Sequence, residues 1–260
     1  MRRGLPAGGG LAVGALIAVL TVIVAALLPT RGSASESSGA RVLVRVLPLG
    51  DSITWGQGSA TQSSYRAPLW HLIGGQSRYA VRFVGSQRSG ALPEPENEGH
   101  RGFTIDRIRA GLDGWLAAAH PDVVLLHIGI NDLNRRIDPQ HAPDRLASLV
   151  DRIYTDRPGV SIVLMGLIPT TPGLGPQIAA YNERAQGLQS IERRAGRMFR
   201  YVAAPALTRG ERVDRLHPDD AGYRRIARAL FPALSSTVAE RIADAAAPGT
   251  TAGPRTTAGG

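Results

Sequence analysis

Two residue types are absent from this chain of 260 residues: cysteine, and also lysine, since all 30 basic residues are arginine. Without cysteine, the sequence excludes disulfides, thiolate metal sites and cysteine nucleophiles. Without lysine, it excludes Schiff-base catalysis, a Ser–Lys dyad and a phosphate-binding loop that ends in Gly-Lys. The composition that remains is 43% hydrophobic, which is enough to build the core of a globular domain.

The net charge of +9 by itself would favour binding to a nucleic acid. The arginines are scattered through the chain, however, and few lie beside aromatic residues, so we expect no nucleic acid. A basic surface that faces anionic polymers or lipid headgroups fits the charge equally well. Two groups of arginines are interpreted as solvated helix faces, with binding to an anionic wall polymer as the alternative: Arg193, Arg194, Arg197 and Arg200, and Arg224, Arg225 and Arg228.

Residues 1–36 have the pattern of an export segment. Arg2 and Arg3 precede an apolar run, Leu11–Leu28, and the small residues Gly32–Ala34 follow it. This order is typical of a secretory signal peptide cleaved after about Ala34. The run is long for a signal core and approaches the ~20 residues that span a bilayer, so an uncleaved membrane anchor is the alternative. Either way, we expect the rest of the chain outside the cytoplasm, secreted or membrane-anchored.

The other end of the chain, residues 245–260, consists mainly of Ala, Gly, Thr and Pro and lacks apolar periodicity. This composition predicts a flexible low-complexity tail. Residues 37–244 are therefore expected to hold the whole folded domain.

Within this domain, strand-like and helix-like segments alternate. The predicted strands are Arg41–Leu49, Tyr79–Val84, Val123–Ile128, Val160–Ile168 and Phe199–Ala203, and the predicted helices are Tyr65–Ile73, Thr104–Ala119, Pro143–Tyr154, Gln177–Ala195 and Asp219–Ala243. The alternation predicts an α/β fold, a three-layer α/β/α sandwich around a parallel five-stranded sheet. In such sheets ligands bind at the carboxyl ends of the strands.

Polar residues follow several of these strands. The sequence Gly50-Asp51-Ser52 follows the first strand and Gly129-Ile130-Asn131-Asp132 follows the third, and each alone is more typical of a turn or helix cap. Gly99–Thr104 precedes the second predicted helix, where a backbone N–H can meet a negative ligand group. His127 lies on the third strand and is interpreted as a hydrogen-bonded core histidine.

Asp214-Arg215-Leu216-His217-Pro218 precedes the last predicted helix. Pro218 suits the first position of that helix, which would put His217 at its start. An aspartate three residues before a histidine can bond the Nδ1 proton, which fixes the tautomer and leaves Nε2 free as a base. The remaining histidines show no spacing for a metal, so we expect no metal site.

Taken together and in this order, these segments resemble the four blocks of the SGNH (GDSL-type) esterase superfamily, which carry Ser, Gly, Asn and His. The likeness is greatest to its carbohydrate-esterase branch, which includes bacterial acetyl xylan esterases, and it runs from about Val46 to Ala229. The matching segments are Leu49–Ser52, Phe83–Gly90, Glu98–Thr104, Gly129–Leu133 and Leu216–Tyr223.

The resemblance implies that the parallel five-stranded sheet is flavodoxin-like, as in the SGNH hydrolase fold. It also implies a role for each matching residue. Ser52 is then the nucleophile, His217 the general base and acid, and Asp214 the residue that orients His217. The oxyanion hole would be formed by the Ser52 and Gly102 N–H groups and the Asn131 side chain. Gly85 competes with Gly102 for the second block, but the Gly-x-Thr before a helix favours Gly102.

The sequence departs from the family pattern at Trp55 and Arg101, which are expected to line the pocket and bind substrate. Trp55 is a candidate for stacking on a sugar, with simple packing as the alternative. We therefore expect an exported serine esterase without cofactor that hydrolyses short-chain, above all acetyl, esters on a polysaccharide such as xylan. The alternatives are a lipase or lysophospholipase on the same fold, a non-catalytic glycan-binding envelope protein, and a basic structural protein of the envelope.

Overall fold

A parallel sheet covered by helices on both faces forms the part of the chain that the computed structural model describes, residues 41–246. The predictions of an export segment at 1–36 and of a tail beyond Ala246 lie outside these residues. The last helix continues through Ala246, two residues into the segment predicted to be a tail.

Five strands form the body of the sheet in the order β2-β1-β5-β6-β7, all parallel. This is the flavodoxin-like order, so the predicted fold class is confirmed. All five residues of β5 are buried, as the continuous apolar run predicts for a central strand covered on both faces. Their bounds are β1 Val42–Gly50, β2 Tyr79–Phe83, β5 Val123–His127, β6 Ser161–Met165 and β7 Phe199–Val202.

Two short strands were not predicted, β3 (Gln87–Arg88) and β4 (Glu96–Gly99). They are antiparallel to each other, and β4 pairs in parallel with the carboxyl end of β1, with Gly99 opposite Gly50. Their polar residues lack the alternation that identifies a strand. This pairing matters for function because it brings the chain after Gly99 alongside the residues that follow β1.

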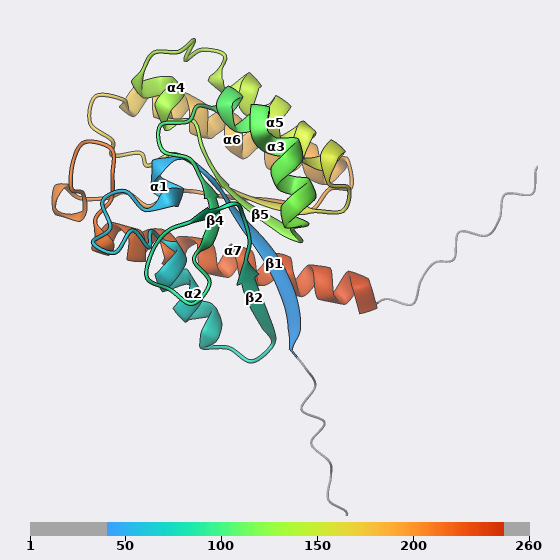
Figure 1. Cartoon of the computed structure of the whole chain (residues 1–260). Coiled ribbons are helices and arrows are strands. Elements are labelled where there is room, and N and C mark those ends of the chain that lie inside the picture. Colours follow the sequence, from blue (N-terminus) through green and yellow to red (C-terminus); the bar gives the residue numbers. More distant parts are fainter. Residues whose placement is uncertain (1–40, 247–260) are drawn as a thin grey trace, which may run out of the picture. The chain divides into compact units, whose positions relative to one another are not determined.

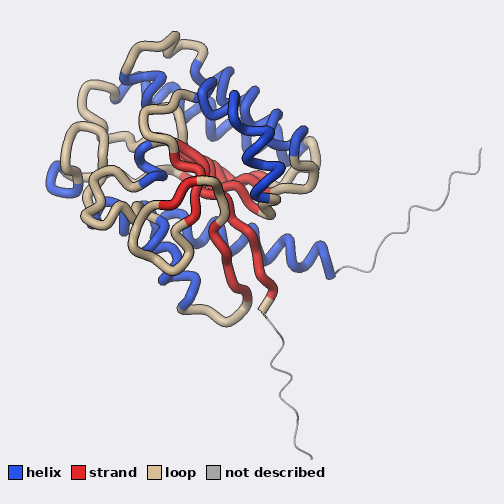
Figure 2. Tube along the Cα trace, viewed as in Figure 1, coloured by secondary structure: helices blue, strands red, loops and turns tan. Residues whose placement is uncertain are grey.

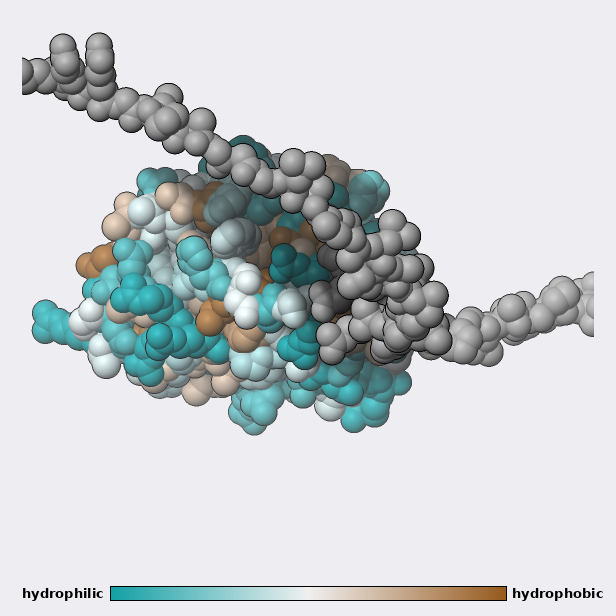
Figure 3. Space-filling model, turned by 90° about the horizontal axis from the view of Figure 1, so that it is seen from below, coloured by the Kyte–Doolittle hydropathy of each residue, from teal (hydrophilic) through white to brown (hydrophobic). Residues whose placement is uncertain are grey.

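Helices on the two faces enclose two apolar clusters (Figure 1). One face is covered by α3 (Ile105–Ala119), α5 (Ala142–Asp156) and α6 (Gly175–Arg194), and the other by α2 (Arg66–Gly74) and α7 (Asp220–Ala246). On the face of the molecule that Figure 3 shows, hydrophilic residues predominate among the coloured residues, with isolated hydrophobic ones between them. Among the described residues, no helix is long and apolar enough to span a membrane.

Long loops and the shortest helices gather at one end of the sheet (Figures 1 and 2). α1 (Ser52–Trp55) follows β1, α4 (Ile130–Asn134) follows β5, and a 3₁₀ turn, Arg209–Glu211, lies in the loop before α7. One local expectation was wrong: α7 begins at Asp220, and Pro218 instead forms an isolated bridge with Arg212. His217 is therefore held in a loop rather than at a helix start.

Candidate active site

Ser52 lies at the first position of α1, directly after β1 reaches the edge of the sheet. Asp51 caps this short helix, since its Oδ1 accepts a hydrogen bond of 2.9 Å from the Ile53 N–H. The Ser52 N–H makes no hydrogen bond to any described residue. An unbonded N–H at a helix start favours a negative charge beside it.

The three residues predicted to act together are in hydrogen-bond contact. The Ser52 Oγ lies 3.0 Å from His217 Nε2, and His217 Nδ1 lies 2.7 Å from Asp214 Oδ2. Ser52 and His217 are 5% and 8% exposed, so only a small part of the pair is accessible to water. A hydroxyl bonded to an imidazole that is itself bonded to a carboxylate is the geometry that activates a serine as nucleophile.

Asp214 holds the backbone of its own loop as well as the imidazole. Its Oδ1 accepts from the backbone N–H groups of Leu216 at 2.7 Å and His217 at 2.8 Å. Partial burial raises the pKa of Asp214, but the hydrogen bonds from the His217 side chain and these two N–H groups outweigh burial, and the pKa ends below its usual value. Asp214 is therefore ionised at neutral pH, as a partner for an imidazolium must be.

Gly58 allows the loop after α1 to approach His217. Its φ is +93°, and a Cβ at this position would lie 2.3 Å from the Pro218 carbonyl oxygen and 3.2 Å from the His217 Cβ. No side chain fits that space. The sequence analysis did not single out Gly58, because the contact joins residues far apart in the chain.

Gly102 lies in a tight turn that directly follows β4, the strand paired with the end of β1. The turn runs from His100 to Phe103 and is closed by the Phe103 N–H, which donates to the His100 carbonyl at 3.1 Å, while the His100 N–H donates to Gly50 O at 2.9 Å. The φ of Gly102 is +76°, as the third position of a type II turn requires. Its N–H has no bonding partner among the described residues and is free for a ligand.

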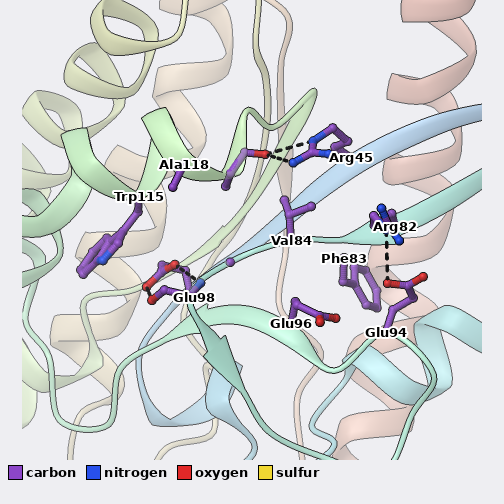
Figure 4. Close-up of a pocket in the computed structure, with 12 residues that line it drawn as sticks. Arg45, Arg82, Phe83, Val84, Glu94, Glu96, Glu98, Trp115 and Ala118 are labelled. Atoms are coloured by element: carbon purple, nitrogen blue, oxygen red, sulfur yellow. Dashed lines mark hydrogen bonds and ion pairs between the residues drawn. The ribbon is translucent and has the colours of Figure 1, made fainter.

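The competing glycine, Gly85, lies elsewhere. It lines a cavity of about 300 Å³ on the α3 side of β2, together with Glu94, Glu98 and Trp115 (Figure 4). Ser52 and His217 do not line this cavity. Gly85 and Gly102, the two alternatives for the second block, thus lie in different places.

Asn131 lies in α4 and is 5% exposed. Its Nδ2 donates to the Phe103 carbonyl at 2.9 Å, which leaves its second amide hydrogen for another acceptor. Phe103, which follows Gly102 in the turn, therefore links Gly102 to Asn131, although the two are far apart in the sequence.

A contact between the buried Glu98 and the partly buried His100 fixes the conformation of the Gly102 turn. His100 Nε2 lies 2.6 Å from Glu98 Oε1, and Glu98, which is fully buried, also accepts from the Ser86 N–H and hydroxyl. The His100 ring is stacked on Phe103 at 4.7 Å and on Trp115 at 4.4 Å between ring centroids. Figure 4 shows Glu98 and Trp115 at the same end of the cavity.

The guanidinium of Arg66 donates hydrogen bonds to the backbone of the segment that follows Ser52. Its side chain is fully buried without a carboxylate partner, and burial lowers the pKa of its guanidinium to about 10. The guanidinium donates instead to oxygens of five residues, which are Thr54, Trp55, Gln62, Ser89 and Pro95. The carbonyls of Thr54 and Trp55 end α1, where the helix dipole favours a cation. The sequence analysis missed Arg66, which looks like any other helical arginine.

Two buried ionisable groups near the carboxyl end of β1 have polar atoms without a partner among the described residues: Oδ2 of Asp51 and both ring nitrogens of His127. Burial, with a smaller contribution from the nearby Asp132, raises the pKa of Asp51 to about 7, although the hydrogen bond from the Ile53 N–H opposes the rise. Burial lowers the pKa of His127 to about 4, so its ring is neutral at pH 7. The hydrogen bonds expected for His127 as a core histidine are not found.

Trp55 and Arg101, expected to bind substrate, contact each other. The Arg101 guanidinium carbon lies 4.9 Å from the centroid of the Trp55 ring, and Arg101 Nε donates to Gln57 Oε1 at 3.1 Å. The pair joins the chain after α1 to the Gly102 turn, and Arg101 is exposed. In the described part of the chain, no group of acidic residues and histidines is arranged to hold a metal ion.

Comparison with known proteins agrees with this geometry. Residues 49–225 match the model of the GDSL-like Lipase/Acylhydrolase family. The structure of a family 3 carbohydrate esterase from Clostridium thermocellum is 32% identical, with a TM-score of 0.69, and the match covers 76% of this chain and 98% of that one. A carbohydrate esterase family 3 structure from Talaromyces cellulolyticus, 24% identical over 76% of this chain and 99% of that one, has the same fold with a TM-score of 0.65.

A multidomain esterase from Ruminococcus flavefaciens is 24% identical over 239 residues, which cover 80% of this chain. The match covers only 30% of that relative, so this chain spans less than a third of its length.

Proposed function

Because this chain belongs to the GDSL-like lipase/acylhydrolase family and is a carboxylic ester hydrolase, we propose that Ser52, His217 and Asp214 are its catalytic triad and that it removes acetyl groups from a polysaccharide. The observation that carries the proposal is the continuous contact from the Ser52 hydroxyl through His217 to Asp214, at 3.0 and 2.7 Å. A protein that only binds glycans has no need of this arrangement.

In the proposed mechanism, Ser52 Oγ attacks the ester carbonyl while His217 Nε2 takes the hydroxyl proton. The imidazolium that forms is stabilised by Asp214, whose carboxylate already bonds Nδ1. His217 then gives the proton to the leaving alcohol, and an acetyl group remains on Ser52. Water, deprotonated by His217, cleaves this acyl-enzyme and releases acetate.

The negative charge on the tetrahedral intermediate requires donors that are in place before the reaction. We assign this role to three groups: the N–H of Ser52, the N–H of Gly102 and the second amide hydrogen of Asn131. The two N–H groups have no partner among the described residues, and the Asn131 amide is oriented by its bond to Phe103.

The choice of a short acyl group rests on the apolar residues near the site. The segment Leu167–Leu174, which follows β6, contains three apolar residues that could line a long acyl groove: Ile168, Pro169 and Leu174. Ile168 and Leu174 are 3% and 7% exposed and belong to the core clusters, whereas Pro169 is exposed. With two of the three side chains buried, this segment offers little apolar surface to a long chain, whereas the methyl of an acetyl group needs little.

The polysaccharide part of the proposal is supported by the 32% identical carbohydrate esterase and by Trp55, an aromatic residue in the same short helix as Ser52. We also propose that the domain acts outside the cytoplasm, on the basis of the pattern in residues 1–36. Amino-terminal sequencing of the exported protein tests this point: a start near Ser35 supports a cleaved signal, and an intact Met1 in the membrane fraction supports an anchor.

The rates of hydrolysis of p-nitrophenyl esters of increasing chain length test the activity. Each CH₂ group removed from water contributes ~0.8 kcal/mol, so an acyl groove would make kcat/KM rise steeply with length. We expect acetate and propionate to be the best substrates and octanoate a poor one. A value that rises from acetate to decanoate would favour the lipase alternative, and Ser52→Ala with normal turnover would refute the triad.

A further inference from the structure

Four arginines, Arg136, Arg209, Arg212 and Arg215, line two cavities at the loop that carries Asp214 and His217. The first cavity, of about 330 Å³, is lined by Arg136 and Arg215 with Asn134 and Gln177 among the other residues. The second, of about 390 Å³, is lined by Arg209, Arg212, Arg215 and Asp214, with Pro172 and Val213. Arg215 lines both cavities.

Arg215 links three loops at this end of the sheet. Its guanidinium donates to the Asn134 side chain after β5 and, at 3.3 Å, to the Pro172 carbonyl after β6. The loop before α7, which carries Arg215 and is orange in Figure 1, lies at the same end of the sheet as α1. The two cavities are therefore on either side of a fixed cation beside the catalytic loop.

The charge of these cavities is not balanced by neighbouring acids. Asp214 is the single carboxylate among the lining residues, and it already accepts three hydrogen bonds from its own loop. Within the described residues, none of the four arginines forms an ion pair. By contrast, Arg145 contacts Asp132 at 3.0 Å and Arg225 contacts Glu211 at 3.0 Å.

The location of the cavities relates them to one half of the substrate. His217 must reach the oxygen of the leaving alcohol to protonate it, so the alcohol part lies on the side of the His217 loop. The acyl part lies toward the oxyanion donors. A polymer whose acetylated hydroxyl meets Ser52 therefore continues past the loop that carries Arg212 and Arg215.

We propose that the two cavities form a subsite for an anionic group on the leaving alcohol, a sugar carboxylate or a phosphodiester, so that the preferred substrate is an acetylated acidic polymer. This inference rests on the proposed acetyl esterase function and adds the charge class of the substrate. A guanidinium fork binds carboxylate and phosphate oxygens in pairs, which suits either group.

The test compares substrates that differ only in charge. Acetylated oligogalacturonate and the same oligomer with methyl-esterified carboxylates are assayed at low and high salt, and acetylated poly(glycerol phosphate) distinguishes phosphate from carboxylate. We expect kcat/KM to be about tenfold higher for the acidic oligomer than for its methyl ester at low salt, and this ratio to fall with added salt because screening weakens attraction between exposed charges. Equal values for the two oligomers would overturn the proposal.

The variants Arg136→Gln and Arg209→Gln remove one cation from each cavity and break no hydrogen bond or ion pair found in the described residues. Together they should bring the ratio of acidic to methyl-esterified substrate close to one. Arg78→Gln and Arg109→Gln together remove two exposed arginines that line neither cavity and form no ion pair within the described residues, so this double variant is the matched control and should leave the ratio unchanged. A ratio that falls equally in the control would indicate only the effect of net charge and refute the subsite.

Binding separates this inference from the proposed activity. Calorimetry measures the affinity of Ser52→Ala for unacetylated oligogalacturonate and for poly(glycerol phosphate), which requires no turnover. If either polymer binds, and binds more weakly after Arg136→Gln and Arg209→Gln, the subsite is supported. If the wild-type protein does not hydrolyse p-nitrophenyl acetate, the esterase proposal alone is refuted. Hydrolysis of p-nitrophenyl acetate with no binding of either polymer would refute the subsite alone.

Discussion

The side-chain amide of Asn131 donates a hydrogen bond of 2.9 Å to the carbonyl of Phe103. This contact joins α4, which follows the central strand β5, to the turn that presents the Gly102 N–H. Two of the three proposed oxyanion donors are thus held relative to each other by one bond. Donors fixed in this way need no reorganisation when charge develops on the substrate, which is the source of their catalytic effect.

Asn131→Ala should therefore remove one donor and also release the Phe103 carbonyl from its partner. We expect kcat to fall by roughly 10²–10³, as for the loss of a single oxyanion donor. Asn131→Asp should be at least as damaging, because it places a carboxylate beside the developing negative charge. Steady-state kinetics on p-nitrophenyl acetate measure both, and a change in KM alone would make Asn131 a substrate contact.

His100→Ala should lower kcat without a comparable change in KM. The substitution removes the bond to Glu98 and the stacking of the His100 ring on Phe103 and on Trp115, so the Gly102 turn loses its fixed position. Small displacements of catalytic groups cost up to ~10² in rate, and we expect a fall of about tenfold or more.

His100→Phe keeps a stacked ring but not the bond to Glu98, so it should retain part of the rate. The exposed His120, changed to Ala, is the matched control. If kcat of His100→Ala equals that of the control, the Glu98–His100 pair does not position the oxyanion turn.

Arg66→Ala should destabilise the fold strongly. It would leave buried carbonyl oxygens at the end of α1 and in the neighbouring loops without a donor, and each unsatisfied group costs about 1–3 kcal/mol. We expect a loss of at least about 3 kcal/mol in the free energy of unfolding, measured by urea denaturation. Arg107→Ala, at an exposed position of α3, provides the comparison. Similar stabilities of the two variants would show that the Arg66 contacts contribute little.

The free energy of unfolding should depend on the protonation of Asp51. Because its pKa rises to about 7 in the folded protein, the folded state keeps a proton that the unfolded chain loses near pH 4. Asp51 therefore makes the protein less stable as pH rises from about 4 to 7, by about 1.4 kcal/mol per unit, or roughly 4 kcal/mol in all.

Asp51→Asn can still accept from the Ile53 N–H but carries no charge. Relative to the wild type, the variant should gain stability between pH 5 and pH 8, as measured by chemical denaturation at each pH. A difference between the two proteins that does not change with pH would contradict the raised pKa of Asp51.

The alternation of apolar runs determined the class of the fold. The apolar runs of β1 and β5 must be covered by helices, and α3 and α5 carry regular apolar stripes, so local pattern was enough to predict a parallel sheet between two layers of helices. The same logic placed Ser52 and Asn131 at one edge of the sheet, since the carboxyl ends of parallel strands meet there.

Tertiary structure decided what local pattern does not encode. The pairing of β4 with β1 depends on a few backbone hydrogen bonds between polar segments, and it distinguishes Gly102 from Gly85. The burial of Arg66 and the fit of Gly58 against His217 depend on contacts between distant parts of the chain. Sequence periodicity reports which face of an element is buried, whereas the partner that buries it is fixed only when the chain closes on itself.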